Sequence, residues 1–191
     1  MMKKKQTFRK VLMYVILIMI AVGFTIPGFL ELGNEQEQAA TKRICRSDAD
    51  CYLVCNEKPQ AALCYQNLCQ QNSCKEIAYY PFQKAKNQVK FAVSIDGKKM
   101  NLKERFDELQ LKNFFVQFQE ASFVSLAPSL DLNMVLEKLN SKIVDKCLTW
   151  GNQTYCEGDN KTLKMWVNGN TSYSYGNYVF QNNDKIDLDY S

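Results

Sequence analysis

The eight cysteines are the residues of this chain whose type and spacing could most directly do chemistry. An even number of cysteines in an oxidising compartment is typical of disulfides. Zinc is the alternative, but zinc sites usually contain C-x2-C pairs or histidines, and the sequence has neither. We therefore predict that the first six pair among themselves, with the pairing left open, and that the last two pair together. In chain order the cysteines are Cys45, Cys51, Cys55, Cys64, Cys69, Cys74, Cys147 and Cys156.

Other kinds of chemistry have less support in the sequence. Thiol–disulfide catalysis favours a C-x-x-C pair, and a nucleophilic triad usually needs a histidine base. Phosphate-loop and dinucleotide fingerprints are also absent from the sequence. Asp48 and Asp50 could suggest calcium, but two carboxylates are few for such a site, and a solvated turn is the more common use of this pattern. We predict no catalytic residue, no metal site and no cofactor.

Three Asn-x-Ser/Thr sequons lie close together, at Asn152, Asn160 and Asn170. Such sequons are acceptors for N-glycosylation when they reach an extracytoplasmic compartment. All three fall in predicted loops. These residues are therefore candidate glycosylation sites, and a glycosylated rim would not serve as a binding face.

Residues 11–30, VLMYVILIMIAVGFTIPGFL, form an uncharged apolar stretch that is long enough to cross a membrane as a helix. Basic residues precede this stretch, and the basic flank of such a segment stays in the cytoplasm. A cleaved signal peptide is the alternative, although the apolar run is longer than a usual signal core. We predict a single-pass anchor whose partner is membrane lipid, which places the rest of the chain outside the cytoplasm.

The anchor divides the sequence into segments of different composition. We expect a cytoplasmic basic tail at 1–10, the anchor at 11–30, a polar tether at 31–44, a disulfide-rich module at 45–76 and a larger domain at 77–191. The module has few large apolar side chains, so cross-links must offset its chain entropy. In residues 31–191, beyond the anchor, the basic and acidic residues nearly balance, and no stripe of basic residues indicates binding to nucleic acid.

Residues 77–191 show the alternation of half-buried strands. The run from Val89 to Ile95 alternates apolar and polar residues and is followed by Asp96-Gly97, a hairpin signal. Apolar residues at helical spacing then predict a short helix from Leu102 and a main helix over 130–143. Further strands are expected at 114–118, 123–126, 163–167, 178–180 and 186–190. The order predicts an α+β fold: a transmembrane helix, a small disulfide-rich module, and a mixed sheet with one main helix.

The segment LKMWVNGN…YVFQNNDKIDLDY resembles the end of a β-grasp (ubiquitin-like) domain, in particular its sulfur-carrier branch. Val167-Asn168-Gly169 and Asn183-Asp184-Lys185-Ile186 occupy the places of that family's turn and of the step into its last strand. The resemblance covers about 60 residues at the C-terminus and implies a β-grasp-like sheet. The family's C-terminal Gly-Gly is replaced by Asp189-Tyr190-Ser191, so the family's conjugation chemistry is not implied.

Two aromatic residues are candidate partner contacts. Phe115 should point away from Phe114 and Phe118 on its strand, and Trp166 away from Met165 and Val167. Large aromatic residues on a polar face are typical of protein interfaces, although packing against another part of the chain would also bury them.

The sequence therefore predicts a membrane-anchored, non-catalytic binding or scaffolding protein with a protein partner outside the cytoplasm. The alternatives are an accessory subunit of a membrane complex and an envelope thiol-redox protein.

Overall fold

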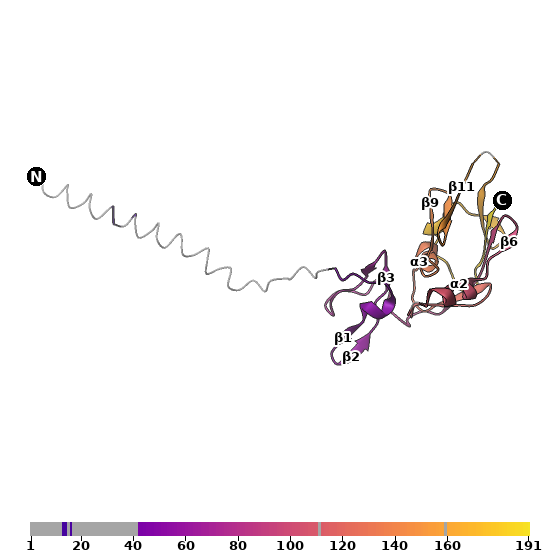
Figure 1. The fold of residues 1–191 in the computed structure, drawn as a ribbon. Helices are drawn as coiled ribbons and strands as arrows, with labels where there is room; N and C mark the ends of the chain where they lie inside the picture. The colour runs from indigo at the N-terminus through magenta and orange to yellow at the C-terminus, as the bar shows by residue number, and fades with distance from the viewer. Residues whose placement is uncertain (1–12, 15, 17–41, 111, 159) are drawn as a thin grey trace, which may run out of the picture. The chain divides into compact units, whose positions relative to one another are not determined.

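The computed structural model in Figure 1 describes residues 13–14, 16, 42–110, 112–158 and 160–191. The chain divides into two units, Met1–Ala40 and Thr41–Ser191. The expected basic tail, most of the expected anchor and most of the tether lie outside the described residues; Met13, Tyr14 and Ile16 are helical. Among the described residues, no helix combines the length and the apolar character that a membrane crossing requires.

The predicted fold class is wrong. The described part of residues 42–191 is mostly β-sheet with two short α-helices. Helix α2 (Leu102–Leu109) is the short helix expected from Leu102, whereas α3 (Leu132–Glu137) is much shorter than the expected main helix. The expected helix over 130–143 ends early because Asn140 adopts a left-handed conformation with φ of 51°, after which Ser141–Val144 forms strand β9. The Ile143 side chain is buried as predicted, but it lies on a strand and not on a helix.

A seven-stranded mixed sheet forms the larger part of this unit. Its order is β13-β12-β14-β5-β8-β7, with β6 pairing with β5. The long central strands β5 and β14 are parallel, and the other pairs are antiparallel. The strands are β5 (Asn87–Ile95), β6 (Lys98–Lys99), β7 (Val116–Phe118), β8 (Ser122–Ser125), β12 (Leu163–Val167), β13 (Asn170–Thr171) and β14 (Lys185–Tyr190).

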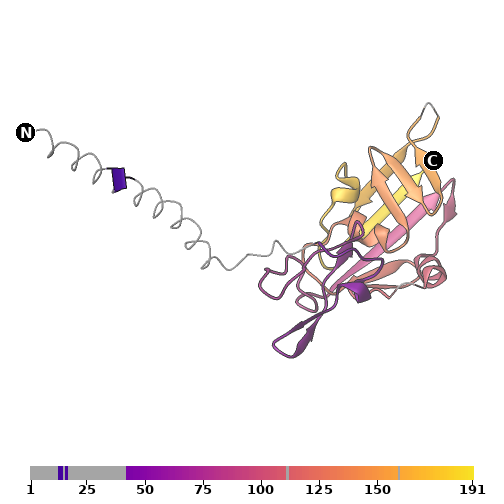
Figure 2. The ribbon, with the colours of Figure 1, turned by 60° about the vertical axis from the view of Figure 1, so that its left-hand side comes forward.

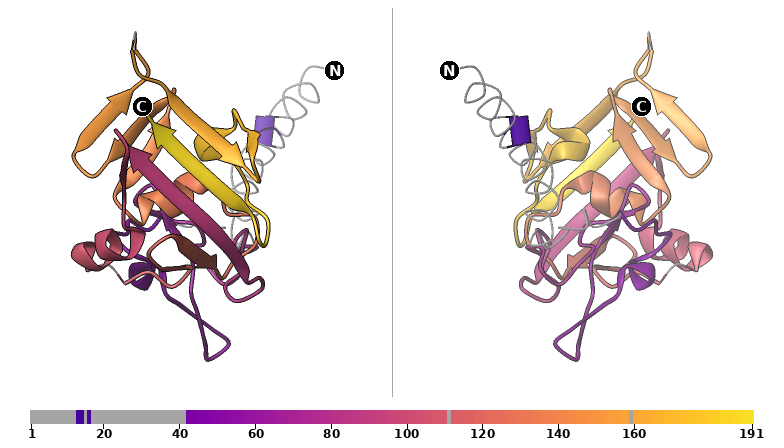
Figure 3. Two further views of the ribbon diagram at one scale, coloured as in Figure 1. Left: turned by 90° about the vertical axis from the view of Figure 1, so that its right-hand side faces the viewer. Right: turned by 90° about the vertical axis from the view of Figure 1, so that its left-hand side faces the viewer.

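Alternation along these strands gives the sheet two different faces. On β5, Val89, Phe91 and Val93 are buried, and the residues between them are exposed or half-buried. Ile186 and Leu188 of β14 and Met165 of β12 continue the buried face, which forms one hydrophobic core with α3. In the left view of Figure 3, β12, β14 and β5 run side by side, and no element of the described residues lies in front of them on the opposite face of the sheet.

A second layer covers the buried face. It contains α3, the 3-10 helix η3 (Tyr175–Asn177) and an antiparallel sheet ordered β11-β10-β9, from β9 (Ser141–Val144), β10 (Cys147–Trp150) and β11 (Gln153–Cys156). In the turned view of Figure 2 the smaller sheet is drawn across the long strands of the large sheet. The side-chain amide of Asn133 exchanges hydrogen bonds of 2.8 and 3.0 Å with the backbone of Ile143, which covers part of the outer edge of β9.

The disulfide-rich module is present. It consists of the 3-10 helix η2 (Asp48–Cys51) and two hairpins, β1 (Leu53–Cys55) with β2 (Lys58–Gln60) and β3 (Cys64–Tyr65) with β4 (Leu68–Cys69). Disulfides join Cys45 to Cys64, Cys51 to Cys69 and Cys55 to Cys74. Leu63 of the module is 1% exposed and belongs to the hydrophobic core of the large sheet. The module and the sheet therefore share a core within the unit Thr41–Ser191.

Candidate functional site

The most unusual polar group in the described chain is the carboxylate of Asp48, which is completely buried. The local turn that carries it is set by Ser47 and Asp50, because the Asp50 carboxylate accepts hydrogen bonds from the backbone N–H groups of Arg46 and Ser47. Asp48 then points inward. Its Oδ1 accepts from Cys64 N at 2.9 Å, and its Oδ2 accepts from Phe114 N at 2.9 Å.

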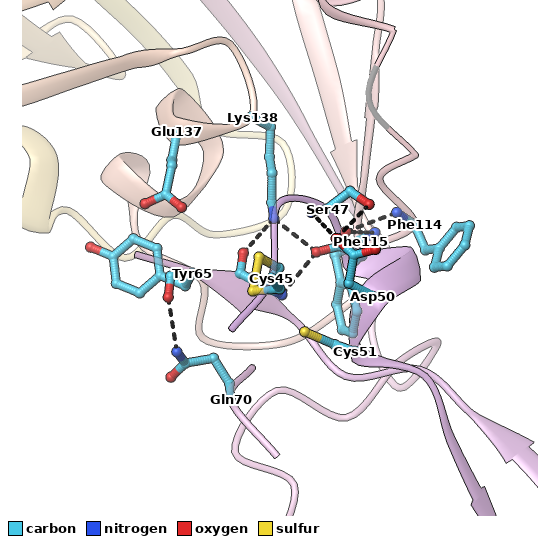
Figure 4. A network of polar contacts seen from close by, with 12 residues as sticks. Cys45, Ser47, Asp50, Cys51, Tyr65, Gln70, Phe114, Phe115, Glu137 and Lys138 are labelled. Carbon is cyan, nitrogen blue, oxygen red and sulfur yellow. Dashed lines mark hydrogen bonds and ion pairs between the residues drawn. A yellow bond between two sulfur atoms is a disulfide. The ribbon is translucent and has the colours of Figure 1, made fainter. Parts of the chain in front are cut away.

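Lys138, which follows α3, completes this network (Figure 4). Its Nζ lies 2.8 Å from Asp48 Oδ1 and donates to the carbonyl oxygen of Cys64 at 2.6 Å. The Lys138 side chain is 5% exposed, so both members of the ion pair are buried. The backbone of Cys64 is thus held on both sides, by Asp48 at its N–H group and by Lys138 at its carbonyl.

This arrangement joins the module to the sheet rather than forming a reactive centre. Both oxygens of Asp48 already accept hydrogen bonds from backbone N–H groups or the Lys138 ammonium, which leaves the carboxylate little capacity to bind a cation. The expectation of a solvated turn holds for the exposed Asp50 but is wrong for Asp48. Removing one partner of a buried ion pair with these additional hydrogen bonds destabilises a protein by several kcal/mol. The pair therefore fixes the position of the module against the sheet.

A second group of ionisable residues lies beside this junction. Burial raises the pKa of Glu137, although the hydrogen bond from Gln66 N and the charge of Lys138 oppose the shift. Burial likewise raises the pKa of Asp131, whose Oδ1 caps α3 by accepting from Met134 N at 2.8 Å. Burial and the charge of Asp131 also raise the pKa of Tyr65. Burial thus favours the protonated, uncharged forms of the two carboxyl groups.

All eight cysteines form disulfides, as predicted. The fourth bond joins Cys147 to Cys156, which lie directly opposite each other in the hairpin β10–β11. The Sγ atoms of Cys45, Cys51 and Cys69 lie within 4.8 Å of one another, but they belong to two disulfides and offer no thiolate for a metal ion.

The open face of the large sheet gathers the exposed side chains of its central strands. The register places Trp166 of β12 opposite Asp187 of β14, and Asp187 beside Ala92 of β5. One step along the strands, Asp189 lies between Lys164 and Ser94 and accepts a 2.6 Å hydrogen bond from the Ser94 hydroxyl. We call this surface the open face; it comprises Gln88, Lys90, Ala92, Ser94, Gln117, Lys164, Trp166, Asp187 and Asp189.

The structure separates the two predicted aromatic contacts. Trp166 is half-buried and lies on the open face. Phe115 is 0% exposed and packs against Phe82 with ring centroids 5.2 Å apart, so its prediction as an exposed contact is wrong. The physical reason is that the chain bends at residues 114–115 and β7 begins only at Val116, which buries two consecutive residues and turns Phe114 outward.

The three sequon asparagines are all exposed. Asn152 lies in the turn between β10 and β11, Asn160 follows β11, and Asn170 begins β13. Their use for glycosylation stays a prediction.

Sequence reasoning did not identify Lys138 or the buried state of Asp48. Asp48 meets partners that lie 16, 66 and 90 residues away along the chain. No local pattern marks the pair, because on the expected helix Lys138 lies off the apolar stripe that includes Leu132, Val135 and Leu136.

No family model, curated protein or solved structure matches this chain. The resemblance of the C-terminal segment to β-grasp domains therefore stays a prediction.

Proposed function

We propose that this chain is a non-catalytic binding or scaffolding protein that works outside the cytoplasm and contacts a protein partner through the open face. The observation that carries this proposal is the position of Trp166 in one row with Asp187 and Ala92 on a sheet face that no described element covers. Asp187 lies opposite Trp166 on the neighbouring strand, and Lys164 precedes the tryptophan by two residues on the same face. A large aromatic residue with charged neighbours is typical of an interface contact with a polar rim.

The compartment is supported by the four disulfides. Disulfides persist in oxidising compartments and are rare in the cytosol. They also rigidify the part of the chain next to the sheet, which lowers the conformational entropy that binding must remove.

Charge reversal on the open face tests the proposal. Lys90 is exposed on β5 and forms no ion pair with any described residue, so Lys90→Glu should change the free energy of unfolding by no more than about 0.5 kcal/mol. Lys142→Glu is the matched control, because Lys142 is an exposed strand lysine on β9 in the other layer. Partners are recovered from intact cells by cross-linking and purification in mild detergent.

We expect Lys90→Glu and Trp166→Ala to reduce recovery of the same partner, while Lys142→Glu leaves it unchanged. Loss of a central aromatic contact of about 2 kcal/mol corresponds to roughly a thirtyfold lower affinity. Equal recovery by all three variants would refute a partner on the open face. A stable assembly with a membrane complex would instead favour the accessory-subunit alternative, and free thiols in the purified protein would favour the thiol-redox alternative.

A further inference from the structure

Large apolar side chains are exposed on the disulfide-rich module and the residues after it more often than on the sheets. Among the described residues of the unit Thr41–Ser191, five of the nine exposed large hydrophobic side chains lie within the short stretch 44–79. Single exposed apolar residues are normal, but a group of them marks a contact with a protein or a membrane. Four of the five lie on two neighbouring segments: Tyr52, Val54, Ile77 and Tyr79.

The first segment is the hairpin β1–β2, which projects from the rest of the unit (Figure 1). Tyr52 has an extended backbone and precedes Val54 by two residues, so both side chains point to the same side of the strand. Pro59 lies directly opposite Val54 on β2 and adds a third apolar group to that side, because paired residues share a face. Val54 is 65% exposed, whereas Leu53 and Cys55 beside it are half-buried. The apolar side of the hairpin therefore faces solvent.

The segment that follows Cys74 is fixed beside this hairpin. The disulfide between Cys55 and Cys74 joins the two segments, and Cys74 Sγ lies 3.5 Å from the carbonyl oxygen of Val54. Ile77 and Tyr79 come shortly after Cys74, with side chains 82% and 78% exposed. Two covalently joined segments thus both present large apolar side chains to solvent.

Hydrogen bonds hold the backbone of both segments in place. Arg43 Nη1 donates to the carbonyl of Tyr52 at 3.0 Å, and Arg43 Nη2 donates to the carbonyl of Gln71 at 3.4 Å. The buried Gln71 in turn donates from its Nε2 to the carbonyl of Glu76 at 3.1 Å, directly before Ile77. An ordered backbone carries the exposed side chains, so a contact through them removes little conformational entropy.

The sequence before the module indicates what covers these side chains. Residues 11–30 contain no charged residue over 20 positions, which is the composition of a segment that partitions into lipid. The described part of the unit begins at Lys42, 12 residues after Leu30, and a chain of that length spans at most about 40 Å. A lipid surface that takes up residues 11–30 is therefore within reach of the module.

The exposed side chains also have the chemistry of a membrane–water interface. Tyr52 and Tyr79 combine an apolar ring with a polar hydroxyl, and tyrosine is enriched at such interfaces for this reason. Lys58 on the hairpin and Lys75 beside Cys74 are exposed and form no ion pair with any described residue, so their ammonium groups can reach lipid phosphates. Glu57 is exposed as well, so the charges nearly balance and the contact needs no anionic lipid.

We propose that these apolar residues lie against the surface of a lipid bilayer. The aliphatic side chains enter the boundary between headgroups and acyl chains, the tyrosine hydroxyls stay among the headgroups, and the two lysines reach phosphates. We call this surface the lipid patch; it comprises Tyr52, Val54, Pro59, Ile77 and Tyr79. The open face is formed by other strands, so the lipid contact and a protein partner on the open face do not depend on each other.

Two exposed tyrosines provide a matched test. Tyr79 in the lipid patch and Tyr173 after β13 are 78% and 81% exposed, so replacing either by tryptophan adds a reporter outside the core. The full chain is purified in detergent and reconstituted into phosphatidylcholine liposomes with or without brominated acyl chains. Bromine quenches tryptophan only at close range. Quenching beyond that of the parent chain, which contains Trp150 and Trp166, therefore reports contact of the new indole with lipid.

We expect extra quenching and a blue-shifted emission for Tyr79→Trp, and neither for Tyr173→Trp. Adding Ile77→Asp to the Tyr79→Trp chain should lower the equilibrium constant for lipid contact by about tenfold or more, because burial of an isoleucine side chain contributes that much. Val144→Asp is the control, since Val144 is an exposed aliphatic residue on β9. Urea unfolding checks that Ile77→Asp leaves the fold as stable as that of the parent chain.

Three results would each overturn the proposal. One is equal quenching of the two tryptophan variants, including none in either. Another is unchanged quenching in Ile77→Asp, which would mean that the contact does not depend on the apolar side chain. The third is an equal loss of quenching in Ile77→Asp and Val144→Asp. These liposomes contain no protein partner, so none of the three results bears on the partner proposed for the open face.

Discussion

Removing one partner of the Asp48–Lys138 pair should strongly destabilise the protein, although the substitution changes a single side chain. Asp48→Ala would leave the buried Lys138 ammonium without a carboxylate, and would remove the acceptor from the N–H groups of Cys64 and Phe114. Lys138→Met would leave a fully buried carboxylate that keeps only its backbone donors. Breaking a buried ion pair in this way costs about 3–5 kcal/mol, so each single variant should lose about that much.

The combined variant should lose much less than the sum of the two. Asp48→Asn with Lys138→Met is uncharged, and the asparagine carbonyl still accepts from one backbone N–H. The other N–H is left without an acceptor, which costs about 1–3 kcal/mol. In a double-mutant cycle built with Asp48→Asn, we therefore expect a coupling energy of at least about 2 kcal/mol, within the range seen for directly interacting residues.

Urea unfolding without reductant measures these free energies, because the four disulfides then constrain the unfolded chain equally in every variant. The exposed pair Lys146–Glu157 is the matched control, with side chains 54% and 37% exposed, and its coupling should stay below about 1 kcal/mol. Additive effects of Asp48 and Lys138 substitutions would refute the reasoning, since they would mean that the two charges do not depend on each other.

The remaining predictions concern pH and packing. Burial acts to raise the pKa of Asp184, but hydrogen bonds from Gln181, Asn168 and Tyr178 outweigh it and lower the pKa. The stabilisation is therefore complete above the unfolded pKa of 3.8 and is lost as pH falls through the folded pKa. Asp184→Asn should remove this loss in acid-unfolding curves. Burial raises the pKa of Glu137 above 4.5, so stability should fall as pH rises from 4.5 through the folded pKa, and Glu137→Gln should flatten that part of the curve. Phe115→Ala should cost about 3–5 kcal/mol by thermal unfolding, whereas Phe114→Ala should cost about 1 kcal/mol or less; equal losses would contradict the observed burial.

Short-range patterns in the sequence predicted much of the sheet. The alternation from Val89 to Ile95 gives β5, because a strand with one buried face needs an apolar residue at every second position. The Asp96-Gly97 signal gives the turn into β6, where both residues have positive φ. The even number of cysteines gave the four disulfides. Each of these signals is carried by neighbouring residues and needs no knowledge of the rest of the chain.

The errors occurred where one pattern suits two structures. Leu132, Val135, Leu136, Leu139 and Ile143 fit a long helix, but α3 ends at Glu137 and Ile143 is buried from a strand. The loop expected around Asn152 is only a tight turn, because Leu148 and Trp150 before it alternate as the buried residues of strand β10. Phe115 was misplaced because a bend before β7 shifts the alternation by one residue, which is enough to move a side chain to the other face.

The junction between the module and the sheet could not be predicted from any local pattern, and it changes how the module should be understood. Its few apolar residues suggested an appendage that cross-links alone stabilise. Leu63 instead completes the core of the large sheet, and the Cys64 backbone is held between Asp48 and Lys138. The Cys45–Cys64 disulfide therefore stabilises a contact with the sheet as well as the module, so its reduction should loosen both parts. The contact is buried and made by charged groups that need each other, so we expect loss of either charge to weaken the module and the large sheet together.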